Sequence, residues 1–178
     1  VSGPVAINMG STSIGVSLSG TATTVASGYA QGAGTDRISG FETVYGTAGA
    51  DTIMGSALAD VIVGGSGPYS INAGDGNDTV VFDLNDTSVI GGAGIDSLKI
   101  DGSMNLVDFT LVRDDIFSEF EVLDLTAAPS QSVKIADVDV YTMTGGGSRT
   151  LTLHANANDG LRLVGNWALD NSNNLNAA

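Results

Sequence analysis

The sequence has no cysteine, one histidine, three prolines and six basic residues among its 178 residues. The lack of cysteine excludes disulfide bonds and zinc sites built on cysteine ligands. No apolar run approaches the roughly 20 residues of a transmembrane helix, so we expect no membrane insertion. The 20 acidic residues give a net charge of −14, which disfavours a nucleic acid or an anionic membrane as a partner.

Catalytic motifs are lacking as well. The sequence contains neither the HExxH pattern of zinc proteases nor the GxSxG pattern of lipases. The only histidine, His154, has a threonine, Thr126, at the matching place of a related stretch, which favours a surface role over catalysis. No group of residues suits acid–base or nucleophilic chemistry. The sequence therefore predicts a protein without enzymatic activity.

The residues that the sequence does favour are glycine and aspartate. Glycine accounts for 25 residues, and 17 of the 20 acidic residues are aspartate. Aspartate suits turns, because its short side chain bonds to nearby backbone groups. Hydrophobic residues still make up 42% of the chain and recur at regular intervals, which excludes an acidic disordered segment.

The clearest pattern is a run of six nine-residue units between residues 46 and 99. They read GTAGADTIM, GSALADVIV, GGSGPYSIN, AGDGNDTVV, FDLNDTSVI and GGAGIDSLK. The eighth place is always apolar, and Val44 extends the series backwards: Ile53, Ile62, Ile71, Val80, Val89 and Leu98. One apolar residue in nine is too sparse for a helix or a hairpin and indicates a parallel solenoid. A flexible Gly/Asp-rich linker is the alternative, and six units in register disfavour it.

These units resemble the repeats-in-toxin (RTX) nonapeptide, GGxGxDxUx, and GAGTDRI at 32–38 matches it too. The resemblance implies an all-β fold, a right-handed parallel β-roll or β-solenoid with calcium in its GGxGxD turns. Two units form one turn of such a roll, so loops 18 residues apart would stack. One edge would carry Asp60, Asp78 and Asp96, and the other Asp51, Tyr69 and Thr87. Calcium takes six to eight oxygen ligands, which aspartates and glycine-rich backbone can supply.

The resemblance also implies a ligand set for about three or four Ca²⁺ ions. The first site joins Gly55, Ala57 and Asp60 to Gly74, Gly76 and Asp78. The second joins Ala73, Asp75 and Asp78 to Gly92, Gly94 and Asp96. The third joins Gln31, Ala33 and Asp36 to Thr47, Gly49 and Asp51. A fourth, weaker site joins Gly46, Ala48 and Asp51 to Gly65 and Gly67 and lacks one carboxylate. Glu42 stays open between a ligand and a solvated charge.

We expect a single elongated solenoid over residues 1–178. Within it, 1–35 form an N-terminal cap or first coils, 36–100 the β-roll, 101–165 wider coils, and 166–178 a cap and tail. The wider coils are indicated by a second repeat, in which 123–135 matches 151–163 at an offset of 28 residues. Trp167 follows the last predicted strand and is expected to cap the open core.

The segment SEFEVLDL at 118–125 resembles the IEVIDLT tracts of large bacterial RTX adhesins. The resemblance implies a calcium-dependent structural and folding module of a secreted or cell-surface bacterial protein, exported by type I secretion. A biofilm or surface adhesin is the leading interpretation. A C-terminal secretion domain of a type I-secreted hydrolase and a calcium-assembled surface-layer protein are the alternatives. Expected partners are calcium, other segments of the same large protein, and a cell or abiotic surface.

Overall fold

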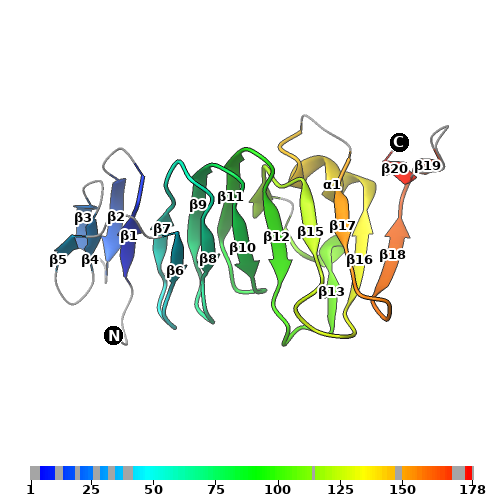
Figure 1. The fold of residues 1–178 in the computed structure, drawn as a ribbon, viewed down its shortest axis with the longest axis horizontal. Helices are drawn as coiled ribbons and strands as arrows, with labels where there is room; N and C mark the ends of the chain where they lie inside the picture. Colours follow the sequence, from blue (N-terminus) through cyan, green and yellow to red (C-terminus); the bar gives the residue numbers. More distant parts are fainter. Residues whose placement is uncertain are drawn as a thin grey trace.

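The computed structural model describes residues 5–10, 14–18, 21–25, 29–31, 35–37, 42–113, 115–146, 150–169 and 175–177. These residues are mostly β-strand, as predicted, and the elements follow one another along the long axis of the molecule (Figure 1). The first strands are β1 (Ala6–Asn8), β2 (Ile14–Leu18), β3 (Thr21–Val25), β4 (Tyr29–Gln31), β5 (Thr35–Arg37), β6 (Thr43–Tyr45), β7 (Thr52–Met54), β8 (Val61–Val63), β9 (Ser70–Asp75) and β10 (Thr79–Phe82).

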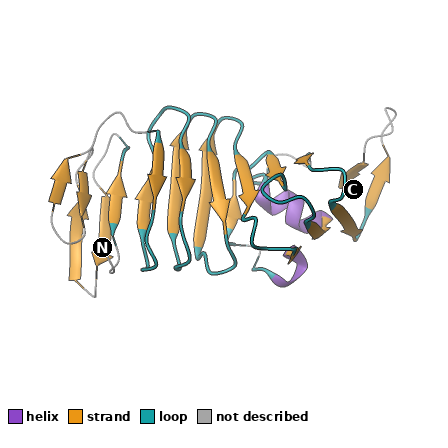
Figure 2. Ribbon diagram, turned by 60° about the horizontal axis from the view of Figure 1, so that its bottom comes forward, coloured by secondary structure: helices purple, strands orange, loops and turns teal. Residues whose placement is uncertain are grey.

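The second half of the described chain contains the remaining strands and two short helices. The strands are β11 (Ser88–Ala93), β12 (Ser97–Ile100), β13 (Leu106–Asp108), β14 (Phe117–Ser118), β15 (Val122–Asp124), β16 (Ser132–Ala136), β17 (Thr152–His154), β18 (Gly160–Val164), β19 (Trp167–Leu169) and β20 (Leu175–Ala177). The helices are the 3₁₀ turn η1 (Phe109–Leu111) and α1 (Asp137–Met143) (Figure 2). No described helix is long and apolar enough to cross a membrane.

Between β6 and β12 the chain alternates between two parallel sheets. One sheet has the order β14-β11-β9-β7-β1-β4-β5 and the other β17-β15-β12-β10-β8-β6. Strands 18 residues apart pair in register, so Ile53 lies beside Ile71 and Ile71 beside Val89. In the other sheet Ile62, Val80 and Leu98 are aligned in the same way.

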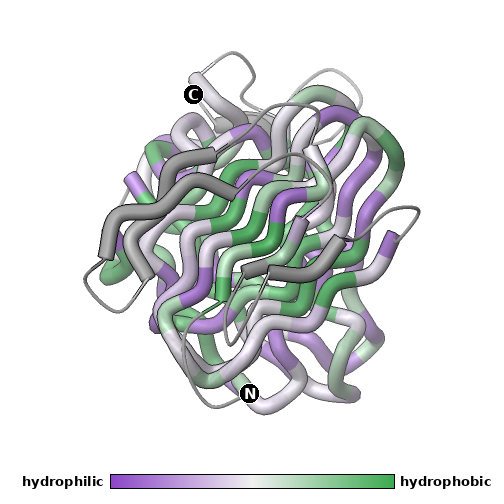
Figure 3. The backbone as a smooth tube through the Cα atoms, turned by 90° about the vertical axis from the view of Figure 1, so that its left-hand side faces the viewer, coloured by the Kyte–Doolittle hydropathy of each residue, from purple (hydrophilic) through white to green (hydrophobic). Residues whose placement is uncertain are grey.

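All of these aliphatic side chains are buried, and Val44 joins them by pairing with Ile62. The predicted two walls of the core are therefore confirmed. In the view along the long axis, hydrophobic and hydrophilic residues alternate along the stacked strands (Figure 3). This alternation is what a strand with one buried face requires.

The wider coils also stack in parallel, with one correction to the predicted register. Leu98 pairs with Leu123, as the 25-residue offset predicted. Val133 pairs with Leu161 at the predicted offset of 28, but Leu123 pairs with Leu153 and not with Leu151. The reason is that the connection between β17 and β18 is two residues shorter than the one between β15 and β16.

The chain before β6 does not follow the nonapeptide pattern. β1 pairs in parallel with β7, aligning Ile7 with Ile53, but β4 and β5 continue this sheet as antiparallel strands. β2 and β3 form a separate antiparallel hairpin. These antiparallel pairs favour the interpretation of the N-terminal segment as a cap over that of first coils.

Stacking predicts a steep cost for core truncation in the two sheets. Ile71 is 1% exposed and lies between Ile53 and Val89. We expect Ile71→Ala to lower the free energy of unfolding by about 2–5 kcal/mol, because the cavity in a thin core cannot easily collapse. Urea unfolding in excess calcium measures this loss. The matched control is Leu58→Ala, at a residue 62% exposed, which should change stability by less than about 0.5 kcal/mol. Equal losses for the two variants would contradict the packing.

Candidate metal centre

A ladder of buried aspartates runs along one edge where the strands turn. Asp60, Asp78 and Asp96 are each 0–1% exposed. The backbone N–H of Asp60 donates to Asp78 Oδ1, and that of Asp78 donates to Asp96 Oδ1, both at 2.8 Å. The predicted 18-residue stacking of these carboxylates is therefore present in the structure.

Each aspartate of the ladder keeps one oxygen without a protein partner. These atoms are Asp60 Oδ1, Asp78 Oδ2 and Asp96 Oδ2. A buried carboxylate oxygen without a partner is costly, so it calls for a cation or a proton. Among the described residues, no group of three or more His, Cys, Asp or Glu side chains could hold a metal ion. An ion on this edge must therefore take most of its ligands from the backbone.

The backbone of the stacked loops is close enough to serve this purpose. Gly74 and Gly92 adopt positive φ angles of 108° and 110°, a conformation that favours glycine. A Cβ atom on Gly74 would collide with the Ser56 carbonyl oxygen, and one on Gly92 with that of Gly74. Glycine thus allows successive carbonyl groups to stack beside the aspartates. The first and second predicted ligand sets lie in these loops, and the structure brings both together.

No protein cation compensates this edge. Residues 38–98 include eight acidic residues but no Lys, Arg or His. Burial raises the pKa of Asp78 to about 6, and the charges of Asp96 and Asp60 raise it further against the lowering effect of the Asp60 N–H. The pKa of Asp96 is raised as well, first by burial and then by nearby Glu121 and Glu119. The ladder is thus electrostatically incomplete without a bound cation.

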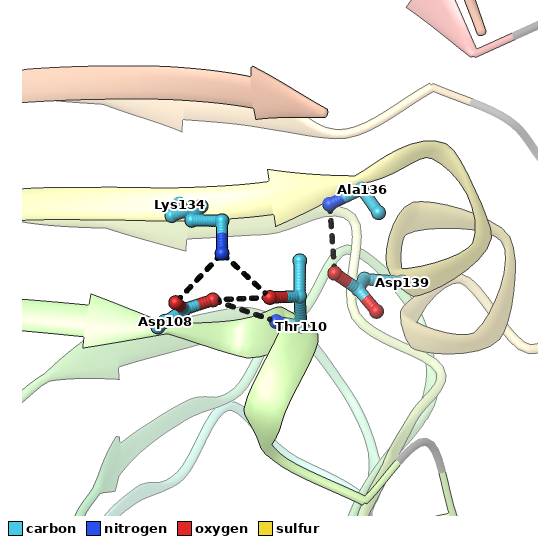
Figure 4. Close-up of polar contacts among 5 residues, drawn as sticks. All are labelled: Asp108, Thr110, Lys134, Ala136 and Asp139. Atoms are coloured by element: carbon cyan, nitrogen blue, oxygen red, sulfur yellow. Dashed lines mark hydrogen bonds and ion pairs between the residues drawn. The ribbon is translucent and has the colours of Figure 1, made fainter. Parts of the chain in front are cut away.

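The wider coils show the opposite arrangement. Lys99 Nζ contacts Asp124 Oδ2 at 2.9 Å, and Lys134 Nζ contacts Asp108 Oδ2 at 2.9 Å. In Figure 4, Lys134 also donates to the Thr110 hydroxyl group at 3.0 Å. The hydrogen bonds from Thr110 and Lys134 lower the pKa of Asp108. Stacked carboxylates in this part of the chain are neutralised by lysine.

The acidic residues at the start of α1 also have a structural partner. Asp139 Oδ2 accepts a hydrogen bond from the Ala136 N–H at 2.7 Å (Figure 4). This contact supports the first turn of the helix, where an acidic side chain is favourable. The prediction that Asp137 and Asp139 are not metal ligands agrees with this role.

The opposite edge of the two sheets does not fit an ion as the sequence predicted. The fourth ligand set (Gly46, Ala48, Asp51, Gly65 and Gly67) lies in two stacked loops, since Gly65 approaches the Thr47 carbonyl and Gly67 that of Gly49. Tyr69, however, is fully buried between these loops. Its hydroxyl group donates to the Thr47 carbonyl oxygen and accepts from the Gly67 N–H at 2.9 Å. The phenol therefore bridges the loops at the place expected for the weak ion.

The third predicted ligand set is not brought together. Asp36 lies in β5 and pairs with Ala30 across an antiparallel ladder, and Ala33 lies outside the described residues. The strand beside β7 is β1, so the Val5 N–H, and not the segment around Asp36, donates to Asp51 Oδ1 at 2.7 Å. Asp51 Oδ2 accepts from the Thr47 N–H. The six-residue step from Ile38 to Val44 breaks the stacking on which this set depended.

Two carboxylates that the sequence analysis left unassigned have defined places in the structure. Glu121 continues the ladder, because its Oε2 accepts from the Asp96 N–H at 2.9 Å. Its 25-residue distance from Asp96 equals the Leu98–Leu123 offset, and that equality was the available signal. Asp86 is 4% exposed and has one oxygen without a partner. The irregular loop 82–87 gave no sequence signal for its burial.

Asp86 gives a pH-dependent prediction. Burial raises its pKa from 3.8 to about 7, against the lowering effect of the Asp83 N–H, and the Asp83 charge raises it further. Stability from this group is complete below pH 4 and is lost as the pH rises through 7. We expect Asp86→Asn to stabilise the protein at pH 8 relative to pH 4 by up to about 4 kcal/mol.

Urea unfolding at both pH values in constant excess calcium measures this difference. Asp115→Asn is the control, because the Asp115 side chain is 74% exposed, and it should show no such pH dependence. Destabilisation by Asp86→Asn at pH 8 would contradict the prediction and assign the carboxylate to a cation.

Tyr69 gives a second prediction. Tyr69→Phe removes the hydroxyl group that bridges the loops, so we expect a loss of about 1–3 kcal/mol in the free energy of unfolding. The number of bound calcium ions should not change. Tyr45→Phe is the control, at a tyrosine 72% exposed, and should leave both quantities unaltered. If calorimetry showed that Tyr69→Phe loses an ion, the hydroxyl group would be a ligand and not a substitute for one.

Comparison with known families agrees with the loop geometry. Residues 32–71 and 54–89 match the family model described as RTX calcium-binding nonapeptide repeat (4 copies). Searches of curated proteins and of solved structures found no match. The matched region contains the stacked loops of Asp51, Asp60 and Asp78. Through residues 32–89, the chain therefore belongs to the RTX calcium-binding nonapeptide repeat family.

Proposed function

We propose that the chain is a calcium-dependent structural module of a secreted or cell-surface bacterial protein. Calcium ions bind between stacked loops on the Asp60–Asp78–Asp96 edge of a right-handed parallel β-roll. One ion is held by Gly55, Ala57, Asp60, Gly74, Gly76 and Asp78, and the next by Ala73, Asp75, Asp78, Gly92, Gly94 and Asp96. Asp78 is shared by the two ions. The bound ions neutralise the ladder and complete the fold.

The observation that carries this proposal is the set of unpartnered oxygens on three stacked, buried aspartates. Oxygen ligands from carboxylates and carbonyl groups are the ones that calcium prefers. The family match and the lack of Lys, Arg and His over residues 38–98 support the same conclusion. A structural role, rather than an enzymatic one, is the proposal that these features favour.

Calcium binding should contribute a large part of the stability. Extracellular calcium modules bind with Kd values of about 10⁻⁴ to 10⁻³ M. At millimolar calcium and the tighter value, each ion adds about 1.4 kcal/mol by mass action. Two or three ions then add about 3–4 kcal/mol, which is a large fraction of the stability of a small domain. The roll has one buried aliphatic residue per nine, so its apolar core is marginal alone.

This dependence suits a protein that is exported unfolded. The module stays unfolded at low cytosolic calcium and folds outside the cell, where calcium is abundant. The resemblance of 118–125 to adhesin tracts favours a large biofilm or surface adhesin exported by type I secretion. Such a module holds neighbouring segments in an extended arrangement and binds no nucleic acid. A single solenoid over residues 1–178, from cap through roll and wider coils, is the arrangement that we propose.

The test is the calcium dependence of folding. We expect excess chelator to abolish the circular-dichroism signal of the roll and to lower the melting temperature, and calcium to restore both. An unchanged spectrum and melting temperature in chelator would refute the proposal. Asp78→Ala removes the shared ligand and should lose two ions by titration calorimetry. Asp51→Ala is the comparison, with an aspartate equally buried but placed beside Tyr69, and should lose none.

A further inference from the structure

The ladder does not end with the last nonapeptide. β11 pairs with β14, aligning Val89 with Phe117 and Ile90 with Ser118, so that Glu119 follows in register with Gly91. β12 pairs with β15, aligning Ser97 with Val122, so that Glu121 is in register with Asp96. The six-residue loop 91–96 is therefore stacked on a turn of only three residues, 119–121. This turn lies beyond the matched family region, which ends at residue 89.

The three-residue turn reproduces the contacts of a consensus loop. Glu121 Oε2 accepts from the Asp96 N–H at 2.9 Å, as Asp78 and Asp96 accept from the preceding aspartates at 2.8 Å. The longer glutamate side chain thus makes the contact that aspartate makes in the six-residue loops. Glu119 adopts a φ angle of 62° and has the only positive φ among the described non-glycine residues.

The backbone at this junction also matches the first calcium site. A Cβ atom on Gly55 would collide with the Ala73 carbonyl oxygen and lie 2.9 Å from Asp60 Oδ2. A Cβ atom on Gly91 would collide with the Glu119 carbonyl oxygen and also lie 2.9 Å from Asp96 Oδ2. A carbonyl and an aspartate oxygen converge in the same way at both places. Asp96 is 0% exposed, and this oxygen has no protein partner.

We infer that the junction between the nonapeptide loops and the wider coils holds a further calcium ion. Its ligands are the Asp96 carboxylate, the Glu121 carboxylate, the Glu119 carbonyl and the carbonyl groups of the first and third places of the loop, Gly91 and Ala93. Water completes the coordination shell, because the short turn supplies fewer carbonyl groups than a six-residue loop. The inference rests on the proposed calcium column and extends it by one ion beyond the consensus repeats.

The test compares two variants that each remove one negative charge. Glu121→Gln keeps an acceptor for the Asp96 N–H and removes the carboxylate, and we expect it to bind one ion fewer per chain. Asp75→Asn is the matched control, because the Asp75 side chain is exposed on the same edge and only its carbonyl is assigned as a ligand. It should keep the full number of ions. Native mass spectrometry and titration calorimetry with calcium measure the number bound.

The outcomes separate this inference from the proposed function. If the unaltered chain binds calcium and Glu121→Gln binds the same number with the same affinity, the junction site is refuted while the calcium module stands. If the unaltered chain binds no calcium, both fail. Crystals of the unaltered chain grown with calcium give a measurement independent of variant folding. An anomalous peak between Gly91 and Glu119 supports the site, and peaks at the two consensus sites without one at the junction overturn it.

Discussion

The structure depends on one electrostatic constraint, a column of buried carboxylates repeated every 18 residues. Parallel stacking aligns Ile53, Ile71 and Val89 in the core and, by the same register, aligns Asp60, Asp78 and Asp96 at the turn. The apolar column is favourable by itself, whereas the acidic column repels itself. A fold that gains the first must therefore neutralise the second. Each region of the chain can be understood by how it does so.

Three different solutions appear along the chain. On the Asp60 edge the charges have no protein partner and require a cation from solution. On the opposite edge Tyr69 removes one carboxylate and replaces the bridging contact with its hydroxyl group. In the wider coils Lys99 and Lys134 supply positive charge to Asp124 and Asp108. The second and third solutions do not depend on the medium. Sensitivity to calcium is thus confined to one edge and one part of the chain.

The parts of this arrangement that could be predicted are those set by a fixed period. The apolar walls and the Asp60–Asp78–Asp96 ladder follow from nine-residue spacing, because identical loops must stack in identical register. Where the period breaks, prediction failed for physical reasons. The short step before Val44 let β1, and not the Asp36 segment, pair with β7. The shorter turn after β17 moved the partner of Leu123 to Leu153. Tyr69 was recognised as a lost ligand, but its size as a substitute for the ion was visible only in the packing.

The placement of the three solutions bears on how such a chain can fold after export. The lysine-paired coils and the aromatic cluster of Phe82, Phe109 and Phe117 lie C-terminal to, or at the end of, the acidic loops. These contacts need no ion, so this end can order first and present the edge of β12 and β11 as a template. A parallel strand gains its hydrogen bonds only when its neighbour is in place, and each added loop then completes a site with the loop already folded. Growth from the metal-independent end toward β7 therefore adds one neutralising ion for each carboxylate that it buries, and at no step does the fold hold more uncompensated charge than a single loop contributes.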